Sequence, residues 1–309
     1  MSKKVNNPHD KFFKSFIYKR KNAIDFLKTF LPEKLSNIID FQSLSVENTS
    51  FINESLSEIF SDAVFKCKIK NQSKEIYISI LVEHKSYPDK YISVQLLNYL
   101  SGAYASQFKE TGNLELVMPF IYYHGKENWT YKPLSEIIDN LPDILKGYVP
   151  NFNTVFVDLN TMTENELESI DNIILLSALL MQKLSFNKKR LLLKIVDIIT
   201  IIEYSDTDDR NFLRNLFVYF NELVDLNIKE LKKIINSLPQ KSKQEIMTTY
   251  QLIKEEGIKE GIKEGIKEGV EKNTVNVVLR GWENGISIDM LANITGLSEE
   301  KVKMIIENR

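Results

Sequence analysis

The sequence predicts an α/β fold built around a β-hairpin and followed by an all-α C-terminal region, and three patterns support this expectation. Two runs, at 62–70 and 75–85, are rich in β-branched and aromatic residues and are separated by four polar residues, which is typical of a hairpin. Apolar residues recur at helical spacing over 10–31, before the hairpin, and in successive segments of 163–256, after it. Strands that lie between helical segments favour a mixed fold.

The composition is that of a globular protein. The chain has 309 residues, of which 43% are hydrophobic and 27% charged, so it is long enough for about two domains and a sizeable core. It has one cysteine, Cys67, and three scattered histidines, His9, His84 and His124. A single cysteine excludes an internal disulfide, and no histidine or cysteine spacing is typical of a zinc site. Any metal site is therefore expected to use oxygen ligands.

Apolar and charged segments constrain location and partners. The N-terminus lacks the apolar run of a signal peptide, and the longest apolar stretches, NIILLSALLM and VDIITII, are too short to span a bilayer. We therefore expect a cytoplasmic protein without a membrane partner. The net charge of -2 argues against a general polyanion coat. Residues 1–34, however, hold nine Lys or Arg against three Asp or Glu, so this segment is a candidate surface for a phosphate backbone.

The elements around the hairpin follow from apolar spacing and from proline. Residues 10–31 predict one or two helices, with a break near 19–21 and an end before Pro32. An extended segment near 41–46 precedes the hairpin, a helix is expected over 91–108, and a strand is expected over 116–123.

The hairpin register is predicted by its loop. If the loop spans Asn71 to Lys74, Lys70 faces Glu75 and every opposing pair follows one constant register. This register gives an unbroken apolar face, since it pairs Ile69 with Ile76, Cys67 with Ile78, Phe65 with Ile80 and Ala63 with Val82. It also sets Asp62 directly opposite Glu83.

Three charged side chains then meet at one end of the hairpin. Opposed Cβ atoms lie roughly 4.5 to 5.5 Å apart, and Lys85 follows Glu83 by two residues on the same face. Asp62 and Glu83 are thus close enough to share a hard cation, with Mg²⁺ expected, Mn²⁺ as its substitute, and the His84 backbone carbonyl as a further ligand. Lys85 would orient a water or neutralise charge on phosphorus, so the expected chemistry is phosphodiester hydrolysis. The alternative is a solvated hairpin end whose charges merely bridge one another.

Several short motifs together resemble one known family. The sequence is similar to the recombination-promoting nuclease (Rpn) family, also described as transposases, of the PD-(D/E)XK nuclease superfamily. The resemblance covers about residues 8–160 and includes His9-Asp10-Lys11-Phe12-Phe13-Lys14, Leu31-Pro32-Glu33, Ser61-Asp62, Val82-Glu83-His84-Lys85-Ser86 with Asp89, and Pro119-Phe120-Ile121-Tyr122-Tyr123-His124-Gly125 with Trp129.

The resemblance implies a restriction-endonuclease-like αβββαβ core and a Mg²⁺-dependent DNA endonuclease that nicks DNA or cuts both strands, with a role in recombination, mobile elements or phage defence. Asp62 and Glu83 match the metal carboxylates of the family. Lys85 stands where many members carry Gln and matches the commoner lysine of the superfamily. Ser61 replaces the Pro of the superfamily name, a position that varies widely.

Other candidate residues have two interpretations each. Gln95 and Tyr99, one helical turn apart, resemble an element that supports the site and contacts DNA in some superfamily nucleases, or they are polar positions on a packed helix. Asp10 and Lys14 are also one turn apart, so Asp10 is expected to cap the helix and pair with Lys14, and a DNA contact by Lys14 is the less favoured alternative. His84 alternates onto the apolar face of its strand, where a buried structural histidine is favoured over a catalytic base.

The domain organisation is predicted from a change of character along the chain. We expect a nuclease domain over 1–160, a helical domain over 161–250, a Gly-Ile-Lys-Glu repeat that forms a helical linker over 251–272, and a small helix-turn-helix-like module over 273–309. The predicted recognition helix of this module is acidic at its start, which favours packing or protein contact over specific DNA recognition.

The repeat predicts self-association. Glycine recurs every four residues beside Ile258, Ile262, Ile266 and Val270, and each interior glycine costs about 1 kcal/mol of helix stability relative to alanine. A four-residue period drifts around a helix and suits a right-handed pairing more than a heptad zipper. We expect a helical arm and a homo-oligomer, most simply a dimer. No Gly-Lys-Ser/Thr context surrounds these glycines, so no nucleotide cofactor is expected.

The sequence thus predicts a Mg²⁺-dependent DNA endonuclease. The alternative is a catalytically silent nuclease-fold module that binds DNA or protein and acts through its helical, oligomerising half.

Overall fold

The structure is a computed structural model that describes residues 7–47, 63–70, 77–203 and 209–308. Its contacts divide the described residues into two compact units, one within residues 5–247 and the other within residues 248–309. The finer boundaries at 160, 250 and 272 remain predictions.

Two helices open the larger unit and break where the sequence predicts. α1 (Pro8–Ile17) and α2 (Arg20–Phe30) are separated at Tyr18 and Lys19, and α2 ends before Pro32, as expected for the residues that precede a proline. The Asn7 side chain accepts the Asp10 N–H at 3.3 Å and caps α1. The expected cap by Asp10 is therefore wrong, because Asn7 precedes the first helical turn. The expected pair is confirmed, with Lys14 Nζ 3.0 Å from Asp10 Oδ2.

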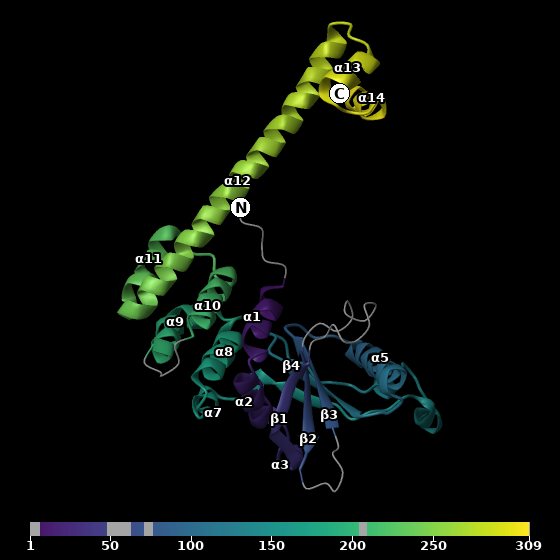
Figure 1. Cartoon of the computed structure of the whole chain (residues 1–309), viewed down its shortest axis with the longest axis vertical. Coiled ribbons are helices and arrows are strands. Elements are labelled where there is room, and N and C mark those ends of the chain that lie inside the picture. The colour runs from purple at the N-terminus through teal and green to yellow at the C-terminus, as the bar shows by residue number, and fades with distance from the viewer. Residues whose placement is uncertain (1–6, 48–62, 71–76, 204–208, 309) are drawn as a thin grey trace. The chain divides into compact units, whose positions relative to one another are not determined.

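A five-stranded mixed sheet forms the centre of this unit (Figure 1). The strands lie in the order β1-β2-β3-β4-β5, with antiparallel pairing from β1 to β3 and parallel pairing from β3 to β5. A short helix, α3 (Glu33–Ile38), precedes β1, and a long helix separates β3 from β4. The elements are β1 (Ile39–Glu47), β2 (Ala63–Ile69), β3 (Tyr77–Lys85), α5 (Ile92–Thr111), β4 (Leu116–Tyr123) and β5 (Val155–Asp158).

The predicted hairpin register is confirmed over the described part of β2 and β3. Ala63 faces Val82, Phe65 faces Ile80 and Cys67 faces Ile78, because this alignment keeps the apolar positions of both strands on one face. The predicted pairs that involve residues 71–76, and the predicted position of Asp62, lie outside the described residues.

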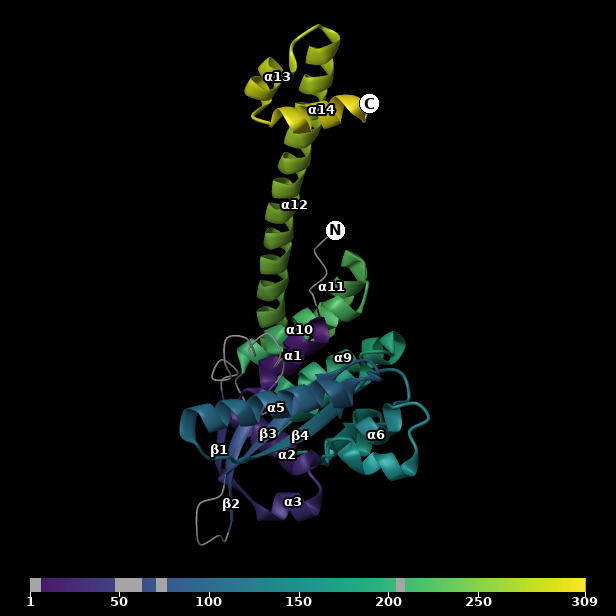
Figure 2. The same ribbon diagram turned by 90° about the vertical axis from the view of Figure 1, so that its right-hand side faces the viewer.

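The two faces of the sheet carry different layers, and Figure 2 shows α5 along one of them. Val64, Val117 and Ile121 form a buried cluster with residues of α5. On the opposite face, the Phe26 ring of α2 packs on Tyr122 of β4 at 5.1 Å between centroids. Successive residues of a strand point to opposite faces, so β3 directs Glu83 and Lys85 to the α5 side and His84 to the α1 and α2 side.

Two short helices lie between β4 and β5, and a helical layer follows β5. Its first helices are short, and α8 is buried along almost its whole length, as expected of a helix that is apolar on all sides. β5, only four residues long, is an addition to the predicted elements. The remaining elements are α6 (Leu134–Ile137), the 3₁₀ helices η2 (Asp143–Tyr148) and η3 (Leu159–Thr161), α7 (Glu164–Glu168), α8 (Ile173–Leu184), α9 (Lys188–Glu203), α10 (Arg210–Leu223) and α11 (Ile228–Ser237).

The smaller unit is helical, as predicted. α12 (Gln240–Glu283) continues through the glycine repeat, and α13 (Ile288–Thr295) and α14 (Glu299–Glu307) fold against its end. Val278, Leu291 and Val302 form the buried centre of this module. Gly296, at φ 69°, ends α13 in the left-handed conformation that glycine adopts most readily. Of the helices in the described ranges, none is both long and apolar enough to cross a lipid bilayer.

Candidate functional site

A buried ionised cluster lies at the C-terminal end of β3. Glu83 and Lys85 are 3% and 7% exposed, although both are charged residue types that are rarely buried unless they are paired. The parallel partner β4 extends alongside them, and Glu83 lies beside Ile121 and Lys85 beside Tyr123. The central position of β3 in the sheet, together with α5 across this face, removes these side chains from solvent.

Each charged group of the cluster has an opposite charge or an amide within hydrogen-bond range. Lys85 Nζ lies 3.2 Å from Glu83 Oε1 and 3.2 Å from Asp89 Oδ2. It donates to Gln95 Oε1 at 3.0 Å, and Gln95 Nε2 in turn donates to Glu83 Oε1 at 2.9 Å. Gln95 Nε2 also contacts the Tyr99 hydroxyl. The single amide of Gln95 thus fixes the positions of Glu83 and Lys85 relative to each other.

Electrostatics keep Lys85 charged in spite of its burial. Burial favours the neutral amine and opposes the charge, but the carboxylates of Glu83 and Asp89 outweigh this effect and raise the pKa of Lys85 above its ordinary value. A buried ammonium is therefore present at neutral pH, directly beside a buried carboxylate.

Asp89 is a member of the cluster that the site prediction did not include. Its Oδ2 pairs with Lys85, and its Oδ1 accepts the Tyr91 backbone N–H at 2.9 Å where α5 begins. One side chain therefore fixes both the ammonium and the start of the helix that carries Gln95. The four-residue spacing from Lys85 was the available signal, but in a loop this spacing does not predict a contact.

A groove opens beside the cluster along α5. It has a volume of about 640 Å³ and is lined by residues of the β3–α5 segment and of α5. These residues are Asp89, Tyr91, Val94, Gln95, Leu97, Asn98 and Ser101. Asp89 and Gln95 belong to both the cluster and the groove, so a molecule in the groove would lie against the buried charges.

The structure places the other predicted site residues as follows. Gln95 and Tyr99 contact the cluster or each other, as described above. Lys14 is paired with Asp10 on α1, and a DNA contact by Lys14 stays a prediction. Asp62 lies outside the described residues. Within the described ranges, His, Cys, Asp and Glu side chains form no group of three arranged to hold a metal ion.

The three histidines, scattered in sequence, converge in space. The His84 ring stacks on His124 with centroids 4.8 Å apart, and His9 packs on His124 at 5.1 Å. His9 Nδ1 also lies 2.7 Å from the Tyr219 hydroxyl of α10. Burial lowers the pKa of His84 well below its ordinary value, that of His124 to about 3 and that of His9 to about 4. His84 is therefore a buried neutral residue, as the sequence predicts.

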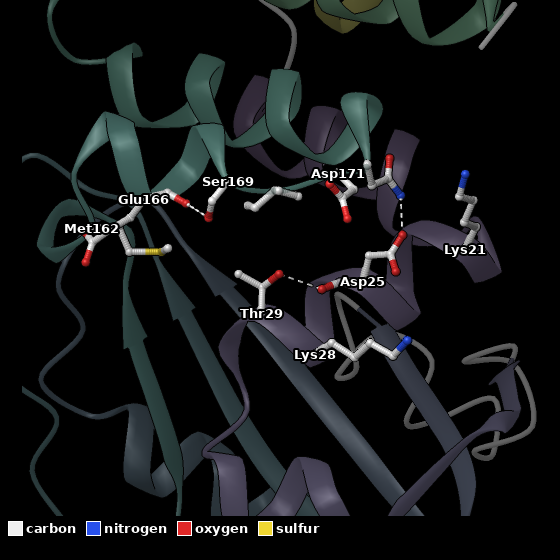
Figure 3. Close-up of a pocket in the computed structure, with 10 residues that line it drawn as sticks. Lys21, Asp25, Lys28, Thr29, Met162, Glu166, Ser169 and Asp171 are labelled. Carbon is white, nitrogen blue, oxygen red and sulfur yellow. Dashed lines mark hydrogen bonds between the residues drawn. The ribbon is translucent and has the colours of Figure 1, made fainter. Parts of the chain in front are cut away.

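A second pocket lies between α2 and the segment before α8 (Figure 3). Its volume is about 630 Å³, and Lys21 and Lys28 line it together with three acidic residues. Asn172 Nδ2 donates to Asp25 Oδ2 at 2.7 Å, while Asn172 Oδ1 caps α8 by accepting the Leu175 N–H at 3.1 Å. These contacts join α2 to α8 and give Asp25 and Asn172 a structural role.

A central sheet that buries a carboxylate, an ammonium and an amide against one another defines a mixed α/β protein with an ionised site inside its fold. The chain belongs to the family described as "Putative transposase, YhgA-like", whose model matches residues 7–212. This confirms the family that the sequence motifs indicate.

Relatives match nearly the whole chain. It is 28% identical over 306 residues to the "Inactive recombination-promoting nuclease-like protein RpnE" of Escherichia coli K12. The alignment covers 96% of this chain and 97% of RpnE. It is 26% identical to recombination-promoting nuclease RpnA of the same strain, with 98% of each chain covered. Recombination-promoting nuclease RpnD of E. coli O157:H7 is 26% identical, with 81% of this chain and 95% of RpnD covered. No solved structure matches significantly.

Proposed function

We propose that this protein is a Mg²⁺-dependent endonuclease that hydrolyses phosphodiester bonds in DNA. The observation that carries the proposal is the buried contact of Glu83, Lys85 and Gln95 at the end of β3. Burial of an acid–base pair is costly unless the pair is well satisfied, and such perturbed ionisable groups beside a groove are characteristic of functional sites. The names of RpnA and RpnD support a nuclease role.

The order of elements supports a PD-(D/E)XK core. α1 and α2 precede three antiparallel strands, α5 follows β3, and β4 returns parallel to β3. This is compatible with the αβββαβ order of that superfamily. We assign Glu83 and Lys85, both on β3, to the Glu-x-Lys positions of its motif.

The donor set fits a hard cation. Glu83 supplies a buried carboxylate, and Asp62 directly precedes Ala63, which pairs with Val82 next to Glu83. We assign Asp62, Glu83 and the His84 backbone carbonyl as the residues that would hold Mg²⁺, since oxygen ligands are those it prefers. The bound ion would acidify a water and stabilise the leaving oxygen.

The remaining side chains act without the ion. The Lys85 ammonium orients the attacking water and neutralises charge on the phosphate, because it stays protonated beside two carboxylates. Gln95 fixes the side chains of Lys85 and Glu83 relative to each other, and Tyr99 contacts Gln95 and supports it. Asp89 is a positioning residue for Lys85.

The second candidate is a silent nuclease-fold module that binds DNA or a partner. It is favoured by one observation, which is that the RpnE relative is named inactive. The two candidates differ in a single respect, namely whether metal-dependent cleavage accompanies binding.

Cleavage of supercoiled plasmid by the purified full chain tests the proposal. Wild-type protein with Mg²⁺ is expected to nick or linearise the plasmid, with Mn²⁺ as a substitute. Glu83→Gln and Asp62→Asn are expected to lose about a hundredfold or more of this activity, with urea unfolding used to verify the fold. Asp139→Asn, an exposed acid-to-amide control on the same unit, should cleave normally. Cleavage that survives in both site variants would contradict the assignment, and DNA binding without cleavage by wild type would favour the silent module.

The biological setting and the assembly are parts of the same proposal. We place the enzyme in the cytoplasm, in recombination, mobile-element transfer or phage defence. We also propose a homodimer formed through α12, because Ile258, Ile262, Ile266 and Val270 are 51–62% exposed along one helix and a row of exposed apolar residues marks an interaction surface.

A further inference from the structure

Two tyrosines are exposed on the short segment that joins β3 to α5. Tyr87 is 61% exposed and Tyr91 is 62% exposed. An aromatic ring buries a large apolar area when it is covered, so each of these uncovered rings is a surface that a ligand can cover. Nothing in the nuclease chemistry described above uses either ring.

The same segment links these rings to the buried cluster. Lys85 Nζ lies 5.9 Å from the centroid of the Tyr87 ring, within cation–π range. The Tyr91 backbone N–H is fixed by Asp89 Oδ1 at 2.9 Å, and Asp89 Oδ2 is bound to the same Lys85 ammonium. The backbone that carries the tyrosines is therefore held in place by the residues of the candidate active site.

Tyr91 also lines the groove of about 640 Å³ that runs along α5. The other lining residues combine apolar side chains, Val94 and Leu97, with an amide and a hydroxyl, Asn98 and Ser101. A groove of this size accommodates a small-molecule ligand, and a nucleotide is in that range. The Lys90 ammonium, 5.5 Å from the Tyr91 ring centroid, adds a positive charge beside the ring. An aromatic face, hydrogen-bonding groups and a nearby cation are the elements that proteins use to hold an unstacked base and its phosphate.

We propose that this groove binds an unpaired nucleotide base, stacked on Tyr91, next to the bond that is cut. The preferred substrate is then DNA with local single-strand character, such as a bubble, a gap or a flap. A base inside a duplex has both faces covered by its neighbours, whereas an unpaired base offers a face to a tyrosine ring. This inference rests on the proposed nuclease function, since it names the substrate of the same site.

Binding measured without cleavage tests the inference by itself. Fluorescence anisotropy in EDTA would compare three labelled oligonucleotides, a full duplex, a duplex with a central bubble, and a single strand, on the full-length chain. Wild type is expected to bind the bubble and the single strand more tightly than the full duplex. Tyr91→Ala should lower affinity for the bubble by about tenfold, in line with the loss of one stacked base, and should leave duplex affinity within about twofold. Tyr91→Phe should bind like wild type.

Tyr148→Ala is the matched control, because Tyr148 is 86% exposed and lies on η2, outside the groove lining. It should bind all three oligonucleotides like wild type. Equal binding of bubble and duplex by wild type, or an equal loss of affinity for all three with Tyr91→Ala, would overturn the inference. A preference for the bubble that depends on Tyr91 would support it even if no DNA were cleaved, so its failure and that of the nuclease proposal are distinguishable.

Discussion

The two units differ in the side chains that they bury and expose. In the unit of residues 5–247, a carboxylate and an ammonium are almost completely buried, with Glu83 3% and Lys85 7% exposed. In the unit of residues 248–309, Ile262 and Ile266 are 58% and 62% exposed. Each arrangement opposes the ordinary preference of its residue type.

In each unit, the residues that depart from this preference contribute little to stability and lie where a function is proposed. A buried charge pair is a weak contributor to stability but provides a preorganised electrostatic environment for chemistry. An exposed apolar row is unfavourable in water until another surface covers it. In the functions proposed above, the larger unit acts on a ligand and the smaller one associates.

The largest expected effect is a loss of stability caused by a cavity in the larger unit, and measuring it would sharpen this comparison. Phe13 is fully buried and its ring stacks on His84 at 4.6 Å and on Tyr122 at 5.6 Å. Phe13→Ala should lower the free energy of unfolding by about 3–5 kcal/mol. Urea unfolding followed by Trp129 fluorescence, in a Trp282→Phe background that removes the second of the two tryptophans, reports this unit alone.

The matched change in the smaller unit is Ile262→Ala. It removes an exposed side chain and should change unfolding of dilute protein by less than about 0.5 kcal/mol, measured by circular dichroism. A loss of several kcal/mol with Ile262→Ala would mean that this row is covered within a single chain, and the contrast between the units would fail.

An intermediate effect is expected from pH on the larger unit. Burial lowers the pKa of His9 to about 4 in the folded chain, whereas an unfolded histidine titrates near its ordinary value of about 6.5. Between these values the unfolded state binds more protons, so stability should be constant above about pH 6.5 and should fall as pH drops toward 4. His84 and His124, with lowered pKa values, act in the same direction, and Lys14 adds positive charge near His84.

The test is the urea midpoint of wild type and His9→Gln between pH 7 and pH 4.5. The variant retains a hydrogen-bonding group near Tyr219 but loses one titrating ring, so its midpoint should fall less steeply. Parallel curves for the two proteins would show that His9 is not a source of the acid sensitivity.

A change in helix stability is expected from the glycines of the repeat. A Cβ added at Gly265 or Gly269 meets nothing within 4 Å, so Gly265→Ala with Gly269→Ala should stabilise α12 by about 1 kcal/mol per residue. If a second copy packs against this glycine surface, the same pair of changes should weaken the dimer, because the helices can no longer approach closely. Sedimentation and circular dichroism measure the two effects separately. Increased helicity with unchanged or stronger dimerisation would contradict a glycine-lined interface.

Local patterns in the sequence were sufficient for much of the fold. The hairpin register follows from the pairing of apolar residues, and α1 and α2 are separated where Tyr18 and Lys19 interrupt the apolar spacing. β5 could not be expected from four residues alone, because its pairing with β4 is long-range. The convergence of the histidines has the same origin, since His9, His84 and His124 come from separate elements that meet only after the sheet and helices have packed.

The part of the candidate site that lies on the hairpin was predictable from the sequence. Glu83 and Lys85 share a strand face by simple alternation, and Gln95 with Tyr99 was recognisable only through family motifs. The position of Asp89 depends on the path of a loop, which local spacing does not determine. The role of Asp62 remains a prediction.

All three histidines of this protein lie in one cluster between β3, α1 and the helical layer. The imidazole signals of the protein therefore come from one location, directly behind the strand that carries Glu83 and Lys85. Histidine-selective NMR of the unmodified chain would thus observe the back of the candidate active site without any introduced label, and would register a ligand that shifts β3 even when the groove side is spectroscopically silent.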